Sequence, residues 1–245
     1  MLTYRMADNN DPYEGIRMNR GPKIESSRRT GWIIAITLLV LGSIYLFTAC
    51  KSNQEMTGKQ KILSTFYPLL MKMGKSTVLR NDTVQPRVSF YSLKTDLIIG
   101  TTFSFDSLKG KKILLVNTAS DCGYTRQYDA LQRLQEQYAD RLVVIGFPSN
   151  DFKNQESASN EEIAGFCRIN YGVRFPLAQK SSVRNGASQN SVFRWLSDPA
   201  LNGWNKQDPQ WNFCKYLINE QGMLTGYFSS AVDPLSAECV APIEK

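Results

Sequence analysis

The sequence predicts an α/β domain in which a central sheet carries helices on both faces. Two short apolar runs, at 113–117 and 142–147, are flanked by polar residues, which is typical of strands buried inside a sheet. Between them Tyr128, Leu131 and Leu134 recur at near-helical spacing, which predicts a helix over 123–139. Strands that alternate with helices in this way form layered α/β domains.

The other elements of this domain follow from apolar alternation, turn signals and one helix capping box, Ser159 to Glu162. In chain order they are a hairpin of 90–94 and 101–105, the strand 113–117, the helix 123–139, the strand 142–147, a helix 159–169, a strand 174–177, a helix 189–196, a hairpin of 215–218 and 223–228, and a terminal helix from Pro234. We therefore predict one domain over residues 89–245.

The net charge of +7 lies outside this domain. Residues 1–88 hold 13 Lys and Arg against 6 Asp and Glu, whereas residues 89–245 hold 16 of each. A neutral domain is not expected to bind nucleic acid. The chain also has no histidine, which excludes Ser-His-Asp and Cys-His hydrolases, zinc sites with His ligands and haem with a proximal His. We expect neither a metal ion nor a cofactor.

A membrane segment is predicted ahead of the domain, after a basic N-terminal segment of residues 1–31. Residues 32–49 are uncharged and mostly apolar, and as a helix they would be about 27 Å long, near the thickness of a hydrocarbon core. Basic residues are more frequent before this run than after it, which favours a domain outside the cytosol, on the periplasmic side of a bacterial membrane. Two interpretations stay open: an uncleaved anchor, or a lipoprotein signal in which Ala49-Cys50 resembles a lipobox and Cys50 carries the lipid.

Residues 50–88 are rich in Lys, Ser, Thr, Asn and Gln, and they are predicted to be a tether. Within them, an apolar patch at 62–71 is expected to lie either on the membrane surface or on the domain.

Cys122 is the first candidate for chemistry because it follows a buried strand and precedes a helix. A thiol at a helix N-terminus is stabilised as the thiolate by the helix dipole and free N–H groups. The neighbouring Asp121 acts in the opposite direction, since an anion raises a thiol pKa. Position 125 is Thr, so the site is not a Cys-x-x-Cys dithiol, and an ordinary thioredoxin-type oxidoreductase is not expected.

Four sequence blocks around this cysteine resemble the glutathione peroxidase family. They are Asn117-Thr118-Ala119-Ser120-Asp121-Cys122-Gly123-Tyr124-Thr125, the block from Gly146 to Glu156, the block from Phe166-Cys167 to Pro176, and Trp211-Asn212-Phe213 followed by Lys215-Tyr216-Leu217. The resemblance extends from residue 89 to about residue 230. It implies a thioredoxin-like fold and the reduction of hydrogen peroxide or organic hydroperoxides.

The resemblance also implies a role for individual residues. Cys122 would be the peroxidatic cysteine, and Gln155, Trp211 and Asn212 would complete a catalytic tetrad by donating hydrogen bonds. Cys167 would resolve the Cys122 sulfenic acid in a disulfide, with thioredoxin, or alternatively glutathione, as the reductant. The short segment between Trp195 and Trp211 implies a monomer.

Two further observations bear on the function. Asp151, Lys153 and Asn154 stand where the family usually has Gln, Gly and Gly, so we expect the loop before Gln155 to differ. The same cysteines could also serve a redox relay that passes oxidation to a partner protein, and the sequence does not separate this alternative from a peroxidase. The complete tetrad makes a non-catalytic binding module the weakest interpretation.

Overall fold

The computed structural model describes residues 32–42 and 55–245. The chain divides into two compact units, Met1–Ala49 and Cys50–Lys245. In the first unit, the described residues 32–42 form an exposed helix. None of the helices within the described ranges is both long and apolar enough to cross a membrane. Cys50 and residues 43–49 lie outside the described residues, so the anchor and the lipidation site stay predictions.

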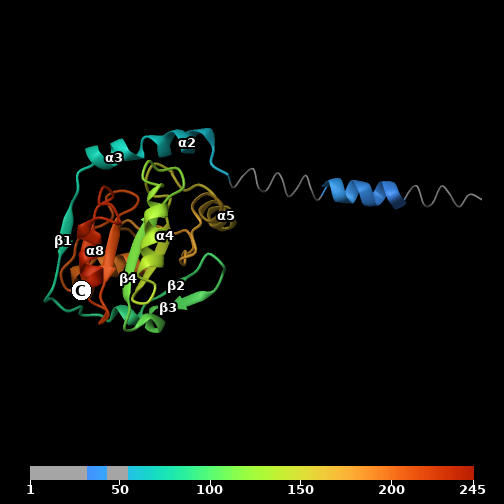
Figure 1. Cartoon of the computed structure of the whole chain (residues 1–245). Helices are drawn as coiled ribbons and strands as arrows, with labels where there is room; N and C mark the ends of the chain where they lie inside the picture. The colour runs from blue at the N-terminus through green and yellow to red at the C-terminus, as the bar shows by residue number, and fades with distance from the viewer. Residues whose placement is uncertain (1–31, 43–54) are drawn as a thin grey trace, which may run out of the picture. The chain divides into compact units, whose positions relative to one another are not determined.

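A mixed sheet lies at the centre of the second unit, as predicted (Figure 1). Its order is β1-β7-β6-β4-β5, with β4 and β5 parallel and the other neighbours antiparallel. The strands are β1 (Val78–Arg80), β4 (Lys112–Thr118), β5 (Leu142–Pro148), β6 (Lys215–Ile218) and β7 (Leu224–Phe228). The predicted central strands and the C-terminal hairpin are confirmed.

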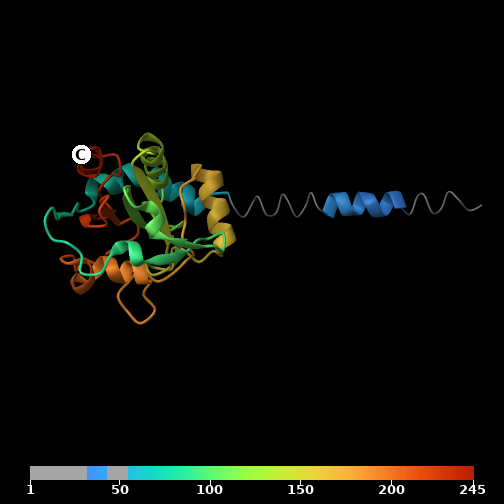
Figure 2. The same cartoon turned by 90° about the horizontal axis from the view of Figure 1, so that it is seen from below.

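The alternation of side chains along β4 divides the core into two layers. Leu114 and Val116 belong to one apolar cluster, and Ile113 and Leu115 belong to the other. The first cluster is covered by α4 (Gln127–Gln137), α5 (Asn160–Tyr171) and α8 (Ala237–Glu244), and the second by α6 (Ser191–Ser197) and the 3-10 helices Phe90–Ser92 and Phe105–Leu108. Figure 2 shows α4 in yellow-green and α6 in orange on opposite sides of the sheet. This arrangement is a thioredoxin-like α/β fold.

Two predicted strands are wrong. Residues 90–92 form a 3-10 helix because Phe90 is fully buried against Phe105 and Trp195, and the small hairpin consists of β2 (Lys94–Asp96) and β3 (Thr102–Ser104). The segment 174–177 joins its neighbours only through isolated bridges near Leu177, since Pro176 has no N–H to donate to a ladder.

The helix predictions hold with shifted boundaries. The Ser159 capping box opens α5 as predicted, and Gly172 ends that helix in a left-handed conformation. The helix predicted over 123–139 begins four residues later, at Gln127, because residues 121–126 form turns. The terminal helix likewise begins at Ala237 rather than Pro234, and a short helix α7 (Pro199–Asn202) follows α6.

The prediction of a tether over residues 50–88 is wrong for the part that the structure describes. This part contains α2 (Gly58–Thr65), α3 (Tyr67–Met73) and β1, and β1 is an edge strand paired with β7. The Met56 N–H donates to Asn170 on α5, and the N–H groups of Arg87 and Val88 donate to Leu201. The folded unit therefore begins before residue 57, and Figure 1 shows α2 and α3 lying along one edge of it.

Candidate active site

Cys122 lies in a turn between the end of β4 and the start of α4. Its side chain is 2% exposed, and its sulfur accepts a hydrogen bond from the Tyr124 N–H at 3.4 Å. The side chains of Trp211 and Asn212 lie close enough to this sulfur to lower the pKa of the thiol as hydrogen-bonding groups. The turn is fixed by Thr125, whose hydroxyl accepts from the Cys122 N–H at 3.1 Å and lies 2.8 Å from the Ala119 carbonyl. Cys122 is thus a free thiol surrounded by N–H donors.

The pKa of the Cys122 thiol reflects two opposing effects. Burial raises this pKa, whereas the hydrogen bonds from the Tyr124 N–H and from Trp211 and Asn212 lower it, and burial is the larger effect. The predicted help from a helix N-terminus is not realised, because α4 begins five residues later. The Asp121 carboxylate is held by α2, where Lys59 and Gln60 donate to it at 3.1 and 2.6 Å.

The structure brings the predicted tetrad together. Asn212 is fully buried, and its amide NH₂ donates to the Gln155 side-chain oxygen at 3.0 Å. The backbone carbonyl of Gln155 accepts from the Asp121 N–H at 3.0 Å, so Gln155 is tied directly to the turn that carries Cys122. The partly buried Trp211 ring packs against Phe152, with ring centroids 5.6 Å apart. Trp211 and Asn212 thus lie at the thiol, and Gln155 is joined to the site through Asn212 and through the Asp121 N–H.

The loop before Gln155 keeps a glycine-like backbone without glycine. Lys153 and Asn154 both have φ of 52°, a left-handed conformation that non-glycine residues adopt at a cost, with Asn among the better tolerated. The Lys153 ammonium lies 5.6 Å from the centre of the Trp211 ring, a cation–π contact that spans this loop and the tetrad.

Asn117 holds the segment that carries Trp211 and Asn212, and sequence reasoning did not assign it this role. Its side chain donates to the Trp211 carbonyl and accepts from the Cys214 N–H, both at 3.0 Å. The Phe213 N–H donates to the Asn117 carbonyl, and Phe213 has a φ of 66°. The sequence signal that could have found it is a polar amide residue at the end of an apolar run that is predicted to be a buried strand. In the structure Asn117 is fully buried, and a buried amide needs hydrogen-bond partners.

A second residue that sequence reasoning missed is the buried carboxyl group of Glu156. The residue is 1% exposed, and its carboxyl group accepts from the Ser120 hydroxyl at 3.1 Å and from the Ser120 backbone N–H. Burial raises the pKa of Glu156 to about 8, although the Ser120 hydrogen bonds and Lys180 oppose this rise. The carboxyl group is therefore mostly protonated at neutral pH, directly beside the Cys122 turn.

Cys167 lies within the second half of α5 and is fully buried as a free thiol. Burial raises its pKa to about 12. Cys122 and Cys167 both belong to one apolar cluster, but only the Cys122 sulfur accepts a hydrogen bond from a backbone N–H among the described contacts. Cys214 and Cys239 are also buried.

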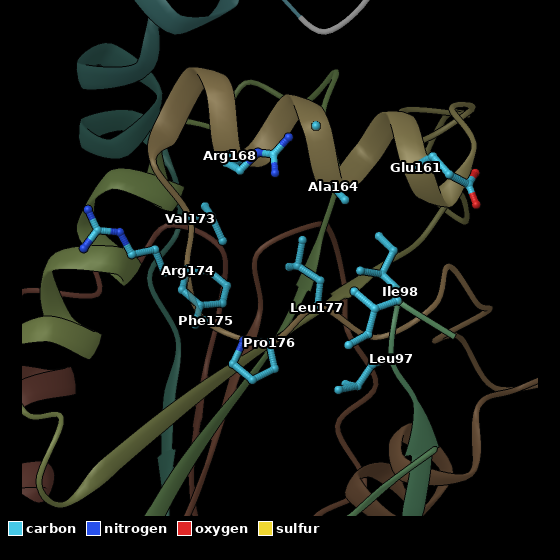
Figure 3. A pocket seen from close by; sticks show the side chains of 12 residues that line it. Leu97, Ile98, Glu161, Ala164, Arg168, Val173, Arg174, Phe175, Pro176 and Leu177 are labelled. Carbon is cyan, nitrogen blue, oxygen red and sulfur yellow. The ribbon is translucent and has the colours of Figure 1, made fainter. Parts of the chain in front are cut away.

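Two hollows lie near these elements. A pocket of about 320 Å³ is lined by Phe152 and by Trp211, which is the one tetrad residue among its lining residues. An apolar groove of about 410 Å³ lies beside α5 (Figure 3), where Ala164 and Arg168 meet Ile98 and Leu177. Neither Cys122 nor Cys167 lines that groove, so it is separate from the thiol site.

Comparisons with known proteins agree with this geometry. A family model described as "Glutathione peroxidase" matches residues 90–197. "Glutathione peroxidase-like peroxiredoxin 2" of Saccharomyces cerevisiae is 42% identical over 151 residues, which are 61% of this chain and 93% of that protein. "Glutathione peroxidase homolog BsaA" of Staphylococcus aureus is 40% identical over 61% of this chain and 94% of that protein. "Glutathione peroxidase-like peroxiredoxin gpx1" of Schizosaccharomyces pombe is 44% identical over 59% and 91%. The chain belongs to the glutathione peroxidase family.

Proposed function

We propose that this protein is a thiol peroxidase that reduces hydrogen peroxide or organic and lipid hydroperoxides through Cys122. The observation that carries the proposal is a buried thiol with three N–H donors aimed at it. The Cys122 thiolate attacks one peroxide oxygen, an S–O bond forms, and the O–O bond breaks. The leaving oxygen takes up a proton, so the products are a Cys122 sulfenic acid and water or an alcohol.

The donors around Cys122 stabilise the charge at each stage of this step. Trp211 and Asn212 hydrogen-bond the sulfur and favour the thiolate over the thiol. Because the Gln155 oxygen accepts from Asn212, the Gln155 NH₂ group is left to donate to the departing peroxide oxygen. The protonated Glu156 adds no negative charge that would oppose thiolate formation.

We assign resolution to Cys167. The Cys167 thiol ionises and its thiolate attacks the Cys122 sulfur; an S–S bond forms, the S–O bond of the sulfenic acid breaks, and the leaving hydroxide takes up the proton that Cys167 lost and becomes water. Cys167 is fully buried within α5 and must first become exposed, which requires the C-terminal turns of that helix to unwind. A protein dithiol such as thioredoxin then reduces the disulfide by exchange.

The remaining assignments rest on the sequence. Residues 32–49 anchor the chain in a membrane, either as an uncleaved helix or as a signal that is replaced by a lipid on Cys50. The excess of basic residues before this run places the peroxidase domain on the extracytoplasmic side. The domain acts as a monomer.

Turnover of the full chain tests the proposal. Consumption of hydrogen peroxide is followed with NADPH, thioredoxin reductase and thioredoxin, and separately with glutathione and its reductase. Cys122→Ser abolishes turnover, and Cys167→Ser abolishes it with thioredoxin. Sustained turnover of Cys167→Ser with glutathione would assign the reductant to glutathione, and turnover by Cys122→Ser would refute the peroxidase assignment.

A further inference from the structure

Helices α2 and α3 cover the Cys122 turn from outside the part of the chain that matches the family model, which begins at residue 90. From α2, Lys59 and Gln60 hold Asp121, the residue before the cysteine. From α3, Leu70 packs so closely on Gly123, the residue after the cysteine, that a Cβ there would lie 2.4 Å from it. The helix pair thus touches both neighbours of Cys122.

The outer face of this pair is apolar and uncovered in the described structure. Phe66 joins the two helices with an α-helical backbone, so residues 58–73 run as one nearly continuous helix. Ile62, Phe66, Leu69 and Met73 follow one another at intervals of four, three and four residues and therefore share one face. They are 61%, 55%, 52% and 75% exposed. We call these four residues the α2–α3 face.

The charge beside this face favours one kind of partner. Residues 56–75 contain Lys59, Lys61, Lys72 and Lys75 and no Asp or Glu. Lys59 is engaged by Asp121, whereas Lys61 and Lys72 lie on the two helices and are exposed. An amphipathic helix with exposed apolar residues and a basic border binds the interface of an anionic lipid bilayer.

The sequence before α2 places a predicted membrane segment only a few residues away from the α2–α3 face. Only residues 50–57 separate the apolar run 32–49 from the start of α2. Eight residues span at most about 28 Å when fully extended. If residues 32–49, or a lipid on Cys50, lie in a membrane, then α2 is always close to that membrane.

We infer that the α2–α3 face docks on an anionic lipid surface and holds the Cys122 turn against it, so that hydroperoxides of membrane lipids are the preferred substrate class. The substrate half of this inference rests on the proposed function, whereas the docking half does not. In the described structure one helix thickness, about 10 Å, separates the α2–α3 face from the residues that flank Cys122.

Tryptophan quenching in full chain reconstituted into vesicles tests the docking. Phe66→Trp places a new fluorophore on the α2–α3 face. Ile99→Trp places one on the turn between β2 and β3, which is also exposed and lies apart from α2 and α3 in Figure 1. The native tryptophans give the same background in both variants. With dibrominated phosphatidylglycerol in the vesicles, the added emission of Phe66→Trp is quenched and that of Ile99→Trp is not.

Charge variants separate the lipid surface from other partners. Lys61→Gln with Lys72→Gln weakens docking roughly 25-fold, because each lysine near an anionic surface adds about 1 kcal/mol. The matched control, Lys94→Gln with Lys206→Gln, removes two exposed lysines on other elements and leaves the quenching unchanged. Equal quenching of Phe66→Trp and Ile99→Trp overturns the docking. A blue shift of Phe66→Trp without quenching by bromolipid overturns it in favour of a second protein chain on this face.

Activity tests the substrate half on the same samples. Phe66→Ser lowers the rate with a phospholipid hydroperoxide in anionic vesicles relative to the rate with hydrogen peroxide, and Ile99→Ser leaves this ratio unchanged. An unaltered ratio in Phe66→Ser overturns the substrate class. Absence of turnover with hydrogen peroxide in the wild type is the separate failure of the proposed function, and it leaves the quenching result standing.

Discussion

Glu156→Gln is the substitution that most directly probes how the Cys122 site is built. The Glu156 carboxyl group is 1% exposed and is held by the hydroxyl and the N–H of Ser120. Glutamine has the same shape and resembles the protonated acid, with an oxygen that accepts from Ser120 and an NH₂ group in place of the acid O–H. The variant therefore keeps the packing and removes the proton equilibrium.

The structure gives both the sign and the size of the effect. Burial raises the pKa of Glu156 from 4.5 to about 8, so the folded chain retains a proton that the unfolded chain releases between these values. The contribution of the protonated Glu156 to the unfolding free energy is fully present below pH 4.5, and it is lost as the pH rises to about 8. A difference of about 3.5 pKa units corresponds to about 5 kcal/mol of unfolding free energy.

Urea unfolding of the full chain in a mild detergent, followed by tryptophan fluorescence, measures this difference. At pH 5 we expect similar unfolding free energies for the wild type and Glu156→Gln, and at pH 9 we expect the variant to be more stable by several kcal/mol. Glu55→Gln, at an exposed position, serves as the control. A stability difference between wild type and Glu156→Gln that does not change with pH would refute a protonated Glu156 in the folded protein.

Three further predictions concern stability and rate. Gly172→Ala destabilises the left-handed C-terminal end of α5 by about 1 kcal/mol. We expect formation of the Cys122–Cys167 disulfide to be up to about fivefold faster, because Cys167 leaves a less stable helix. Stopped-flow fluorescence after mixing with peroxide measures disulfide formation as the phase that follows sulfenic acid formation, and a slower phase in the variant would contradict unwinding. Asn117→Ala costs about 2 kcal/mol and slows the reaction with peroxide, whereas the control Asn219→Ala, in a remote turn, changes only stability. Lys59→Ala removes an exposed ion pair and costs under about 0.5 kcal/mol in urea unfolding, and a loss of several kcal/mol would mean that α2 is essential to the fold.

Periodicity was sufficient to predict the elements whose burial is uniform. Strands β4 and β5 are apolar runs between polar residues, and the hairpin of β6 and β7 has a clear turn at 219–222. The Ser159 capping box is local chemistry, so it predicted the start of α5 correctly. These elements needed no knowledge of their tertiary partners.

The errors arose where distant contacts override the local signal. Phe90 belongs to a 3-10 helix because it fills a space between Phe105 and Trp195, which the sequence around it does not reveal. Strand β1 has only three residues and forms because β7 offers a free edge, so its polar surroundings looked like a tether.

The candidate site was predicted from motifs, but its supporting contacts were not. The four blocks located Cys122, Gln155, Trp211 and Asn212, and the structure brings these residues together. The hydrogen bonds of Asn117 to the segment that carries Trp211 and the burial of Glu156 depend on how three loops pack, and the spacing of residues in the sequence does not predict that packing. The same holds for α2, which binds Asp121 across 62 positions of sequence.

The chemistry assigned to this protein begins when Cys122 reacts with peroxide and ends when Cys167 resolves the product in a disulfide. The first measurement to make is the intact mass of the full chain after one equivalent of hydrogen peroxide. We expect the loss of two hydrogens in the wild type, a trapped sulfenic acid in Cys167→Ser, and no change in Cys122→Ser. A wild type that stops at sulfenic or sulfinic acid would exclude resolution by Cys167, and an unreactive Cys122 would exclude the peroxidase function altogether.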